Sequence, residues 1–384
     1  MDIIDGTLKA SDGLMHEEGW ELEEQTIVQY RIRNQLLGSM HAENAVETVK
    51  WMGAVQGQDY SPGLWAVGLR TPHTSKEEIE KCLEDKKIVR SWTMRHTIHF
   101  VAMEDLRWMI HFSKDKMVQR YKNHMEKEAG LDESTLRKSL DVFIKILEGK
   151  KLVSRSVLRE RLEEAGVDTS KQRFYHLLWY AAQNGLIFIG PMEGKQQSFG
   201  LVEEWAPKQH SLTKEEALYK LAVNYLNSHG PATVQDFAWW SGLSQKEAKL
   251  GFQSASALSF DIKESKREYW YLMQNQKIEA APHGQMHLLY GLDEFFIGYK
   301  NRSDVLEEQM YRKIDPNRQG LFFPLFFEGK IVGHWKPIIE KKAIFMKYSL
   351  AEATEVSEDR LNSEAKRYSD FFHLSLHDVQ IQYI

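Results

Sequence analysis

The segment LVSRSVLRERLEEAGVDTSKQRFYHLLWYAAQNGLIFIGPMEGKQQSFGLVEEW, residues 152–205, is the clearest copy of a unit that the chain repeats. Apolar residues at helical spacing run up to Gly166, and a second helical stripe runs up to Gly185. Glycine commonly follows the end of a helix. Residues 187–189 then have a strand pattern, which a turn joins to a second strand. The segment therefore predicts two helices followed by a β-hairpin, the order of a winged-helix unit.

Two further segments repeat this order, so the sequence predicts three units in tandem. Residues 213–273 contain the turn Ser241-Gly242-Leu243 between two helical stripes, as in a helix-turn-helix. Towards the C-terminus the spacing of apolar residues changes from the helical period to the alternation typical of strands. This change indicates an α+β domain with a mostly antiparallel sheet. The predicted divisions are an acidic N-terminal extension (1–25), a first winged-helix unit (26–103), a helical connector (104–150), second and third units (151–208 and 209–280) and the C-terminal α+β domain (281–384).

The composition is typical of a globular protein without disulfides. Of the 384 residues, 42% are hydrophobic and 27% are charged. Cys82 is the single cysteine, which excludes an intrachain disulfide and favours the reducing cytoplasm. The acidic N-terminus lacks a signal-peptide pattern, and no run of roughly 18 apolar residues indicates a membrane span. We therefore expect a cytoplasmic monomer that does not associate with membranes.

Charge is distributed unevenly along the chain. The formal net charge is −5, which argues mildly against a nucleic-acid partner. Residues 86–122, however, contain nine Lys or Arg and only three acidic residues. A local basic patch of this kind is sufficient for a DNA-binding face. The alternative is that these Lys and Arg side chains only form the solvated surface of a helix. Charge alone does not distinguish a DNA-binding face from such a surface.

Gln56 and Gln58 are the main candidates for catalytic residues. They stand two positions apart in the segment WMGAVQGQDYSPGLWAVGLR, residues 51–70. In an extended loop, side chains two apart point to the same side, so two amides can converge on one water molecule. The alternative is a pair of solvated surface residues.

A helix start follows the two glutamines. Ser61 is placed to cap this helix, and Pro62 suits its first turn. A helix N-terminus directs free N–H groups and positive potential towards an anion such as a phosphate. Tyr60 and Trp65 are candidate surfaces for base stacking. Asp59 can supply charge or a general base, although a turn or capping role is the simpler interpretation.

Four blocks of the sequence, in this order, resemble the tandem winged-helix DNA glycosylases of the AlkZ/YcaQ type. They are VQGQDYSPGLWAVGLR (55–70), SWTMRHTIHFVAMEDLRWM (91–109), GLDEFFIGYKNRSDVL (291–306) and the hairpin region 323–335. The resemblance covers residues 28–340 approximately. It implies an α+β fold in which three tandem winged-helix units surround a concave channel of DNA size, with a β-rich C-terminal domain.

The resemblance also assigns a role to the glutamines. In family members that unhook crosslinks, two glutamines flank the hydrolytic water, and these correspond to Gln56 and Gln58. Another branch of the family has Asp at the second position, so Gln58 favours the first branch. The family pattern has a hydrophobic residue between the glutamines. Gly57 departs from this pattern, and we expect the glycine to loosen the water site.

The predicted DNA contacts are Tyr60, Trp65, Arg95, His96, His99 and Arg173. Arg95 is expected to bind a phosphate, and the two histidines a phosphate or the lesion, with a structural role as the default for His99. A His-x-x-His pair without partner ligands does not predict a metal site.

Two acidic residues and two tryptophans complete the candidates. Asp293 is expected to point into the channel as possible catalytic support. Asp293 and Glu294 are adjacent, so on a strand they would face opposite sides and would not form a carboxylate pair. Trp239 and Trp240 are predicted to be core residues.

We therefore predict a monofunctional DNA glycosylase that acts on bulky or crosslinked N-alkylated purines in double-stranded DNA. An N7- or N3-alkylated purine is already cationic, so the enzyme chiefly positions water and stabilises an oxocarbenium-like transition state. The alternative is a non-catalytic winged-helix DNA binder, either a transcription regulator or a lesion sensor, and a third interpretation is a scaffold for protein partners. No cofactor, metal or nucleotide is predicted, because the sequence has no phosphate-binding loop or dinucleotide motif.

Overall fold

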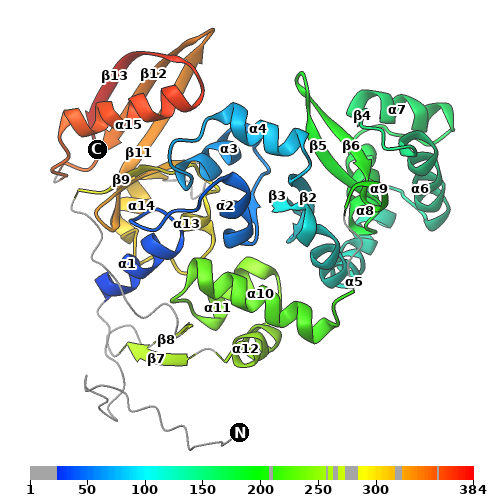
Figure 1. Cartoon of the computed structure of the whole chain (residues 1–384), viewed down its shortest axis with the longest axis horizontal. Helices are drawn as coiled ribbons and strands as arrows, with labels where there is room; N and C mark the ends of the chain where they lie inside the picture. The colour runs from blue at the N-terminus through cyan, green and yellow to red at the C-terminus, as the bar shows by residue number, and fades with distance from the viewer. Residues whose placement is uncertain are drawn as a thin grey trace, which may run out of the picture.

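The structure is a computed structural model that describes residues 24–206, 211–256, 258–262, 267–272, 284–315, 322–352 and 354–384 (Figure 1). The predicted acidic extension therefore lies almost entirely outside the described residues. Helices and strands are mixed along the chain, and the α+β class predicted from the sequence is confirmed. No helix in these ranges is long and apolar enough to cross a membrane.

The first part of the chain is mainly helical and ends in a β-hairpin. Asn44 caps its second helix by accepting from two backbone N–H groups, and Ser75 with Glu78 forms a capping box on its fourth. The third helix begins at Tyr60 with Asp59 at its N-cap, so the predicted N-cap Ser61 and first helical residue Pro62 are each two residues too late. The elements are α1 Glu24–Asn34, α2 Ala45–Met52, β1 Val55–Gln56, α3 Tyr60–Leu69, α4 Lys76–Glu84, β2 Ile88–Met94 and β3 Thr97–Ala102.

The connector and the second predicted unit follow, and their strands join those of the first. The elements are α5 Met103–Lys127, α6 Glu133–Leu147, β4 Val153–Ser154, α7 Arg155–Glu164, α8 Arg173–Gln183, β5 Ile187–Glu193, β6 Gln196–Leu201 and α9 Val202–Trp205. A single sheet has the order β1-β3-β2-β5-β6-β4, with β2 and β5 paired at Arg90 and Ile189. The hairpins of the first two predicted units therefore form one sheet.

The third predicted unit begins with α10 Lys214–His229, which packs against α2 and α5. Each of its three helices begins with a capping box, and Gly242 ends the second helix in the left-handed conformation at φ 75°. Trp240 is buried, but Trp239 is 46% exposed, so the core prediction is wrong for Trp239. The elements are α10 Lys214–His229, α11 Val234–Ser241, α12 Gln245–Ser254, β7 Leu258–Ile262 and β8 Arg267–Tyr271.

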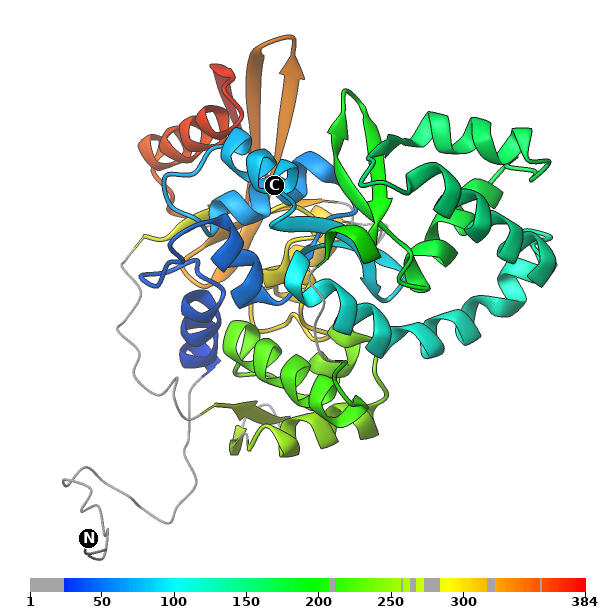
Figure 2. The same ribbon diagram turned by 45° about the vertical axis from the view of Figure 1, so that its right-hand side comes forward.

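The C-terminal part is a five-stranded sheet in the order β13-β12-β11-β10-β9. Its pairs are antiparallel except β12 with β13, in agreement with a mostly antiparallel sheet. The elements are β9 Met286–Leu288, α13 Glu294–Ile297, α14 Glu308–Ile314, β10 Phe323–Phe327, β11 Lys330–Glu340, β12 Ala343–Leu350, α15 Glu358–Phe371 and β13 Ser375–Tyr383. In Figures 1 and 2 this part and the helices α6 to α8 lie on opposite sides of the molecule.

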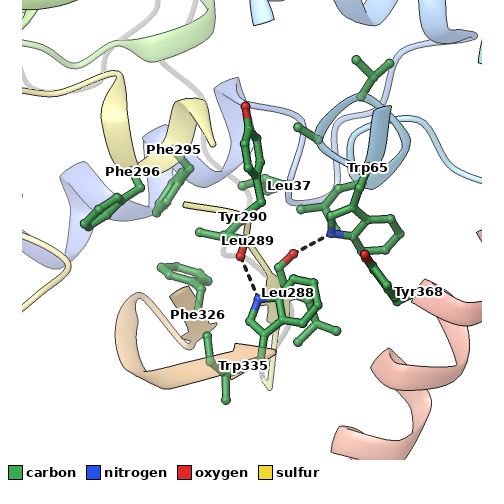
Figure 3. Close-up of a cluster of buried hydrophobic side chains, with 14 of the residues drawn as sticks. Leu37, Trp65, Leu288, Leu289, Tyr290, Phe295, Phe296, Phe326, Trp335 and Tyr368 are labelled. Atoms are coloured by element: carbon green, nitrogen blue, oxygen red, sulfur yellow. Dashed lines mark hydrogen bonds between the residues drawn. The ribbon is translucent and has the colours of Figure 1, made fainter. Parts of the chain in front are cut away.

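A core of aromatic residues joins α3 to the C-terminal sheet (Figure 3). Trp65 Nε1 donates to the Leu288 carbonyl at 2.6 Å, and Trp335 Nε1 donates to the Leu289 carbonyl at 2.7 Å. Trp65 also packs edge-on against Tyr368, with ring centroids 4.9 Å apart. These contacts fix the helix that follows the two glutamines, so the glutamine loop stands on a rigid support.

Candidate active site

Gln56, Gly57 and Gln58 lie in the loop between β1 and α3. β1 pairs with β3, with Gln56 opposite His99. The pairing continues through the N–H of Gly57, which donates to the Ile98 carbonyl at 2.8 Å. Gln56 is buried, whereas Gln58 is exposed. The two predicted catalytic residues therefore meet at the edge of the six-stranded sheet, one beneath the surface and one on it.

Hydrogen bonds orient both glutamine amides. The N–H of Gln58 donates to Gln56 Oε1, and the N–H of Ile98 donates to Gln58 Oε1, each at 3.2 Å. Both side-chain oxygens are thus acceptors for the backbone, and neither Nε2 group has a partner among the described residues. The two amides can therefore offer N–H donors to a water molecule. A water held in this way needs another group to accept the proton that it loses on attack.

Gly57 is held by packing and by hydrogen bonds. Its carbonyl accepts from Arg90 Nε and Nη2 at 3.2 and 2.8 Å, and a Cβ placed on Gly57 would lie 2.9 Å from Phe100 Cδ2. The contacts contradict the expectation that Gly57 loosens the loop, because its N–H, carbonyl and Cα are all engaged. Sequence analysis missed Arg90, a buried residue whose pKa is lowered by burial to about 10.

Glu294 is a second residue that sequence analysis missed. It is 0% exposed, and its two oxygens accept from the Gln56 N–H at 2.8 Å and from Trp240 Nε1 at 2.9 Å. His229 Nε2 lies 3.6 Å from Oε2. Burial opposes the charged form of Glu294, but the His229 ring and the Arg95 guanidinium favour it, and its pKa is about 2. An ionised carboxylate therefore connects the glutamine loop to α10 and α11.

Asp293 is buried and paired, so the prediction that it points into a channel is wrong. Arg70 donates to both of its carboxylate oxygens, at 2.7 and 2.9 Å, and the N–H of Phe295 donates to Oδ1 at 2.8 Å. Asp293 is thus the N-cap of α13 and not a strand residue. Its contacts support a structural role.

Asp59 is exposed next to Gln58 and occupies the N-cap position of α3. Its side chain makes no capping hydrogen bond, in contrast to the simpler interpretation of this residue. The carboxylate is therefore available to a ligand in front of the glutamine loop. Among the candidate residues it is the acidic side chain that reaches solvent at this loop.

Comparisons with known proteins relate this loop to a family. The model of the family described as DNA glycosylase AlkZ-like matches residues 49–371, which include the glutamine loop and Glu294. The chain belongs to the AlkZ-like DNA glycosylase family. The interstrand DNA cross-link repair glycosylase of Streptomyces sahachiroi is 21% identical over 341 residues, which cover 82% of this chain and 88% of the relative. The structure of Streptomyces sahachiroi DNA glycosylase AlkZ superposes with a TM-score of 0.76 at 20% identity, over 94% of this chain and 100% of the other.

In this AlkZ-like chain, Arg95 and His96 form the turn between β2 and β3, with φ angles of 52° and 64°. His96 stacks on Tyr121 with ring centroids 4.2 Å apart, and burial lowers its pKa to about 4. His99 is fully buried with Nδ1 3.1 Å from Thr93 Oγ1, and burial lowers its pKa to about 3. The burial of His99 agrees with the structural role that is its default, whereas His96, contrary to the prediction, does not present a free ring to DNA.

The other predicted DNA contacts have different surroundings. Trp65 belongs to the core of the AlkZ-like fold, so this prediction is wrong. Arg173 is partly exposed and donates to the Asp168 and Gly130 carbonyls at 2.9 Å, and its contact with DNA stays a prediction. Tyr60 is half-buried, and its hydroxyl donates to Glu80 Oε1 at 3.1 Å. Tyr60 and the partly exposed Arg95 stay predicted DNA contacts.

Proposed function

We propose that this chain hydrolyses the N-glycosidic bond of bulky or crosslinked N7- or N3-alkylated purines in double-stranded DNA, as a monomer in the cytoplasm. Membership of the AlkZ-like family supports the reaction type. The relative named as an interstrand cross-link repair glycosylase supports the class of lesion. The observation that carries the proposal is that the Nε2 groups of Gln56 and Gln58 have no partner among the described residues, in the loop where Gln58 is followed by the exposed Asp59.

In the proposed reaction, the Nε2 groups of Gln56 and Gln58 donate to one water molecule and hold it in the loop. The water oxygen attacks C1′ of the damaged nucleotide, and the bond from C1′ to the purine nitrogen breaks with its electron pair on the purine. Asp59 accepts the proton that the water loses. The products are a neutral alkylated purine and an abasic sugar that carries the new hydroxyl group.

The proposed site contains no acid that could protonate the leaving base. Glu294 stays ionised: burial raises its pKa, but the nearby His229 ring and the Arg95 guanidinium lower it to about 2. The reaction therefore depends on a purine that is already positively charged. Positioning of the water by preorganised amides supplies the remaining catalysis.

The test is a single-turnover assay with purified protein and a duplex that carries one N7-methylguanine or a nitrogen-mustard crosslink. Appearance of abasic sites, scored as alkali-labile strand breaks, is the expected result. A protein that binds the duplex and leaves every base intact would instead be the non-catalytic DNA binder, the second candidate. A protein that binds no DNA at any salt concentration would exclude both.

A further inference from the structure

Trp239 is a large aromatic side chain that is both exposed and fixed in orientation. The other tryptophans of the described ranges are buried or partly buried. Trp239 Nε1 donates to the Ile297 carbonyl at 3.0 Å, so the ring is anchored at one edge. An anchored ring that faces solvent offers a flat apolar surface to a partner and loses little side-chain entropy on binding.

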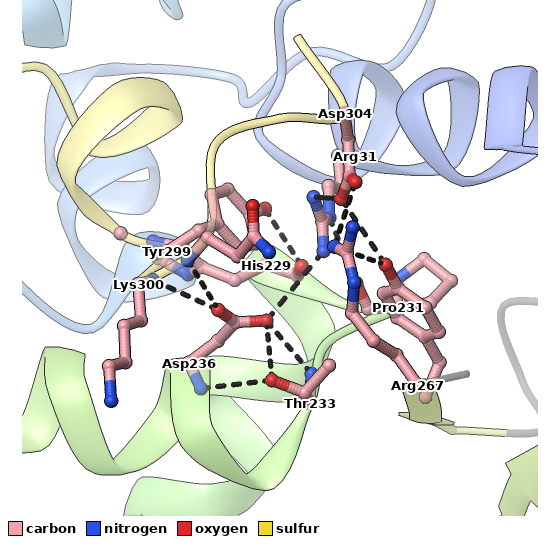
Figure 4. A network of polar contacts seen from close by, with 12 residues as sticks. Arg31, His229, Pro231, Thr233, Asp236, Arg267, Tyr299, Lys300 and Asp304 are labelled. Atoms are coloured by element: carbon pink, nitrogen blue, oxygen red, sulfur yellow. Dashed lines mark hydrogen bonds and ion pairs between the residues drawn. The ribbon is translucent and has the colours of Figure 1, made fainter. Parts of the chain in front are cut away.

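Helix α11, which carries this tryptophan, is bonded to α13 and to the loop that follows α13. Near the start of α11, Asp236 Oδ1 accepts from the Lys300 N–H at 2.9 Å (Figure 4). Near its end, Trp240 Nε1 donates to Glu294 Oε2 at 2.9 Å. The other oxygen of Glu294 accepts from the Gln56 N–H at 2.8 Å. The short helix α13 therefore holds both the exposed ring and the backbone of the first glutamine.

A second contact joins α11 to the β2–β3 turn. A Cβ placed on Gly242, which ends α11, would lie 3.3 Å from Arg95 Cγ, so the turn packs closely on this end of the helix. Trp239 precedes Gly242 by three residues, less than one helical turn, and lies at the same end. The β2–β3 turn leads into Ile98, whose N–H donates to Gln58 Oε1. The ring thus belongs to a helix end that contacts both supports of the glutamine loop.

The segment after α13 adds positive charge near this ring. Lys300 follows Ile297 by three residues and is exposed, and its ammonium has no ion pair among the described residues. In Figure 4 the Lys300 side chain points away from the contacts around Asp236. Surfaces that bind unpaired bases combine aromatic rings, which stack on the bases, with cations, which attract the phosphates. The surroundings of Trp239 therefore favour a nucleic acid over an apolar protein partner.

We propose that Trp239 stacks on a DNA base within a few nucleotides of the damaged one and so fixes the position of the duplex against Gln56 and Gln58. The inference rests on the proposed function, because it places this base relative to the hydrolytic water. Ile297 and Glu294, which hold the ring and the loop, are about 4.5 Å apart along a helix, and bases follow one another every ~3.4 Å. A base face becomes available where the lesion disrupts the helical stack.

The test combines substitutions of Trp239 with removal of single bases. Trp239→Leu and Trp239→Phe are compared with wild type on lesion duplexes in which each nucleotide near the lesion is replaced in turn by an abasic analogue. On the duplex with all bases present, Trp239→Leu should lose about five- to a hundredfold in affinity and in single-turnover rate, the range for one stacked base. Trp239→Phe keeps an aromatic ring and should retain part of both. Removal of the stacked base should bring wild type to the level of Trp239→Leu, with no further loss in that variant.

The control is Tyr219→Leu, which removes an exposed aromatic ring from the neighbouring helix α10 and should leave both readouts unchanged. Wild-type affinity in Trp239→Leu, or losses from variant and base removal that multiply at every position, would overturn the inference. Melting temperatures separate a lost contact from misfolding, and Trp239→Phe supplies a second variant. Failure of the proposed function is distinguishable, because wild type would then excise nothing from the duplex with all bases present. The affinity measurements would still decide whether the ring stacks on a base.

Discussion

The backbone N–H of Gln56 donates to the buried carboxylate of Glu294 at 2.8 Å, across 238 positions of sequence. The same carboxylate accepts from Trp240 Nε1, and the Gln56 carbonyl accepts from the Tyr290 hydroxyl at 2.8 Å. Both backbone groups of Gln56 are therefore fixed by residues from the C-terminal part of the chain. This arrangement can transmit the packing of α10 and α11 to the proposed water site.

Glu294→Gln should slow excision about ten- to a hundredfold with DNA affinity unchanged, because an amide retains one acceptor oxygen and cannot serve both donors. If Glu294 acts by positioning Gln56, the double variant with Gln56→Ala should be no slower than Gln56→Ala alone. Multiplicative losses would indicate a general effect on the fold instead. Glu364→Gln, a mostly buried carboxylate on α15, is the control and should excise normally.

Gln56→Ala and Gln58→Ala should each reduce the excision rate roughly ten- to a thousandfold, the range for loss of one preorganised polar group. Binding to the lesion duplex should persist, since neither side chain pairs with a charged group. Single-turnover rates and fluorescence anisotropy measure the two effects. Gln380→Ala on β13 is a glutamine control. Normal excision by both loop variants would contradict the proposed water site.

Asp59→Asn should slow excision by about a hundredfold or more, because it removes the proposed proton acceptor and keeps the size of the side chain. Asp59→Glu should retain part of the activity. Asp85→Asn changes an exposed aspartate at the end of α4 and should have no effect. An Asp59→Asn protein as fast as wild type would show that water loses its proton to another group.

The charge of the lesion should decide which bases are released. Without a general acid, the site should excise N7- and N3-alkylpurines and leave uracil, 8-oxoguanine and hypoxanthine in the strand. Duplexes with one lesion each, analysed for released base, measure this selectivity. Efficient release of uracil with N7-alkylguanine left intact would refute the mechanism while preserving the glycosylase class.

The free energy of unfolding should fall as the pH is lowered below 6.5. Burial lowers the pKa of His99 and of His287 from 6.5 to about 3, so the unfolded chain takes up protons at these residues before the folded chain does. Their contribution is complete above pH 6.5 and is lost as pH falls towards 3. Protonation linked to each of these histidines can lower the free energy of unfolding by ~1.4 kcal/mol per pH unit in this window. Urea unfolding at pH 7, 6 and 5 measures the slope, and His287→Leu should flatten it; an unchanged slope would count against the burial of this histidine.

Much of the secondary structure was predictable from local pattern. Helices α7 and α8 end just before Gly166 and Gly185, as predicted, and the turn at Gly242 has the left-handed conformation that glycine readily adopts. The glutamine motif was also recognised from the sequence, because the two residues are neighbours in the chain. Such features depend on spacing, capping and turn chemistry, which act over a few residues.

The surroundings of the site depended on the tertiary structure. Asp293 and Trp65 were expected at a DNA-facing surface, yet one pairs with Arg70 across 223 positions and the other bonds to Leu288 across 223 positions. Glu294 was set aside because adjacent strand residues face opposite ways, but it begins a helix. The sequence by itself determined the α+β elements and the glutamine pair. Only the packing of distant segments decided which charged side chains are buried, which are paired and which remain accessible to DNA. The reason is that burial and ion pairing are set by contacts between residues far apart in the chain, which no local pattern records.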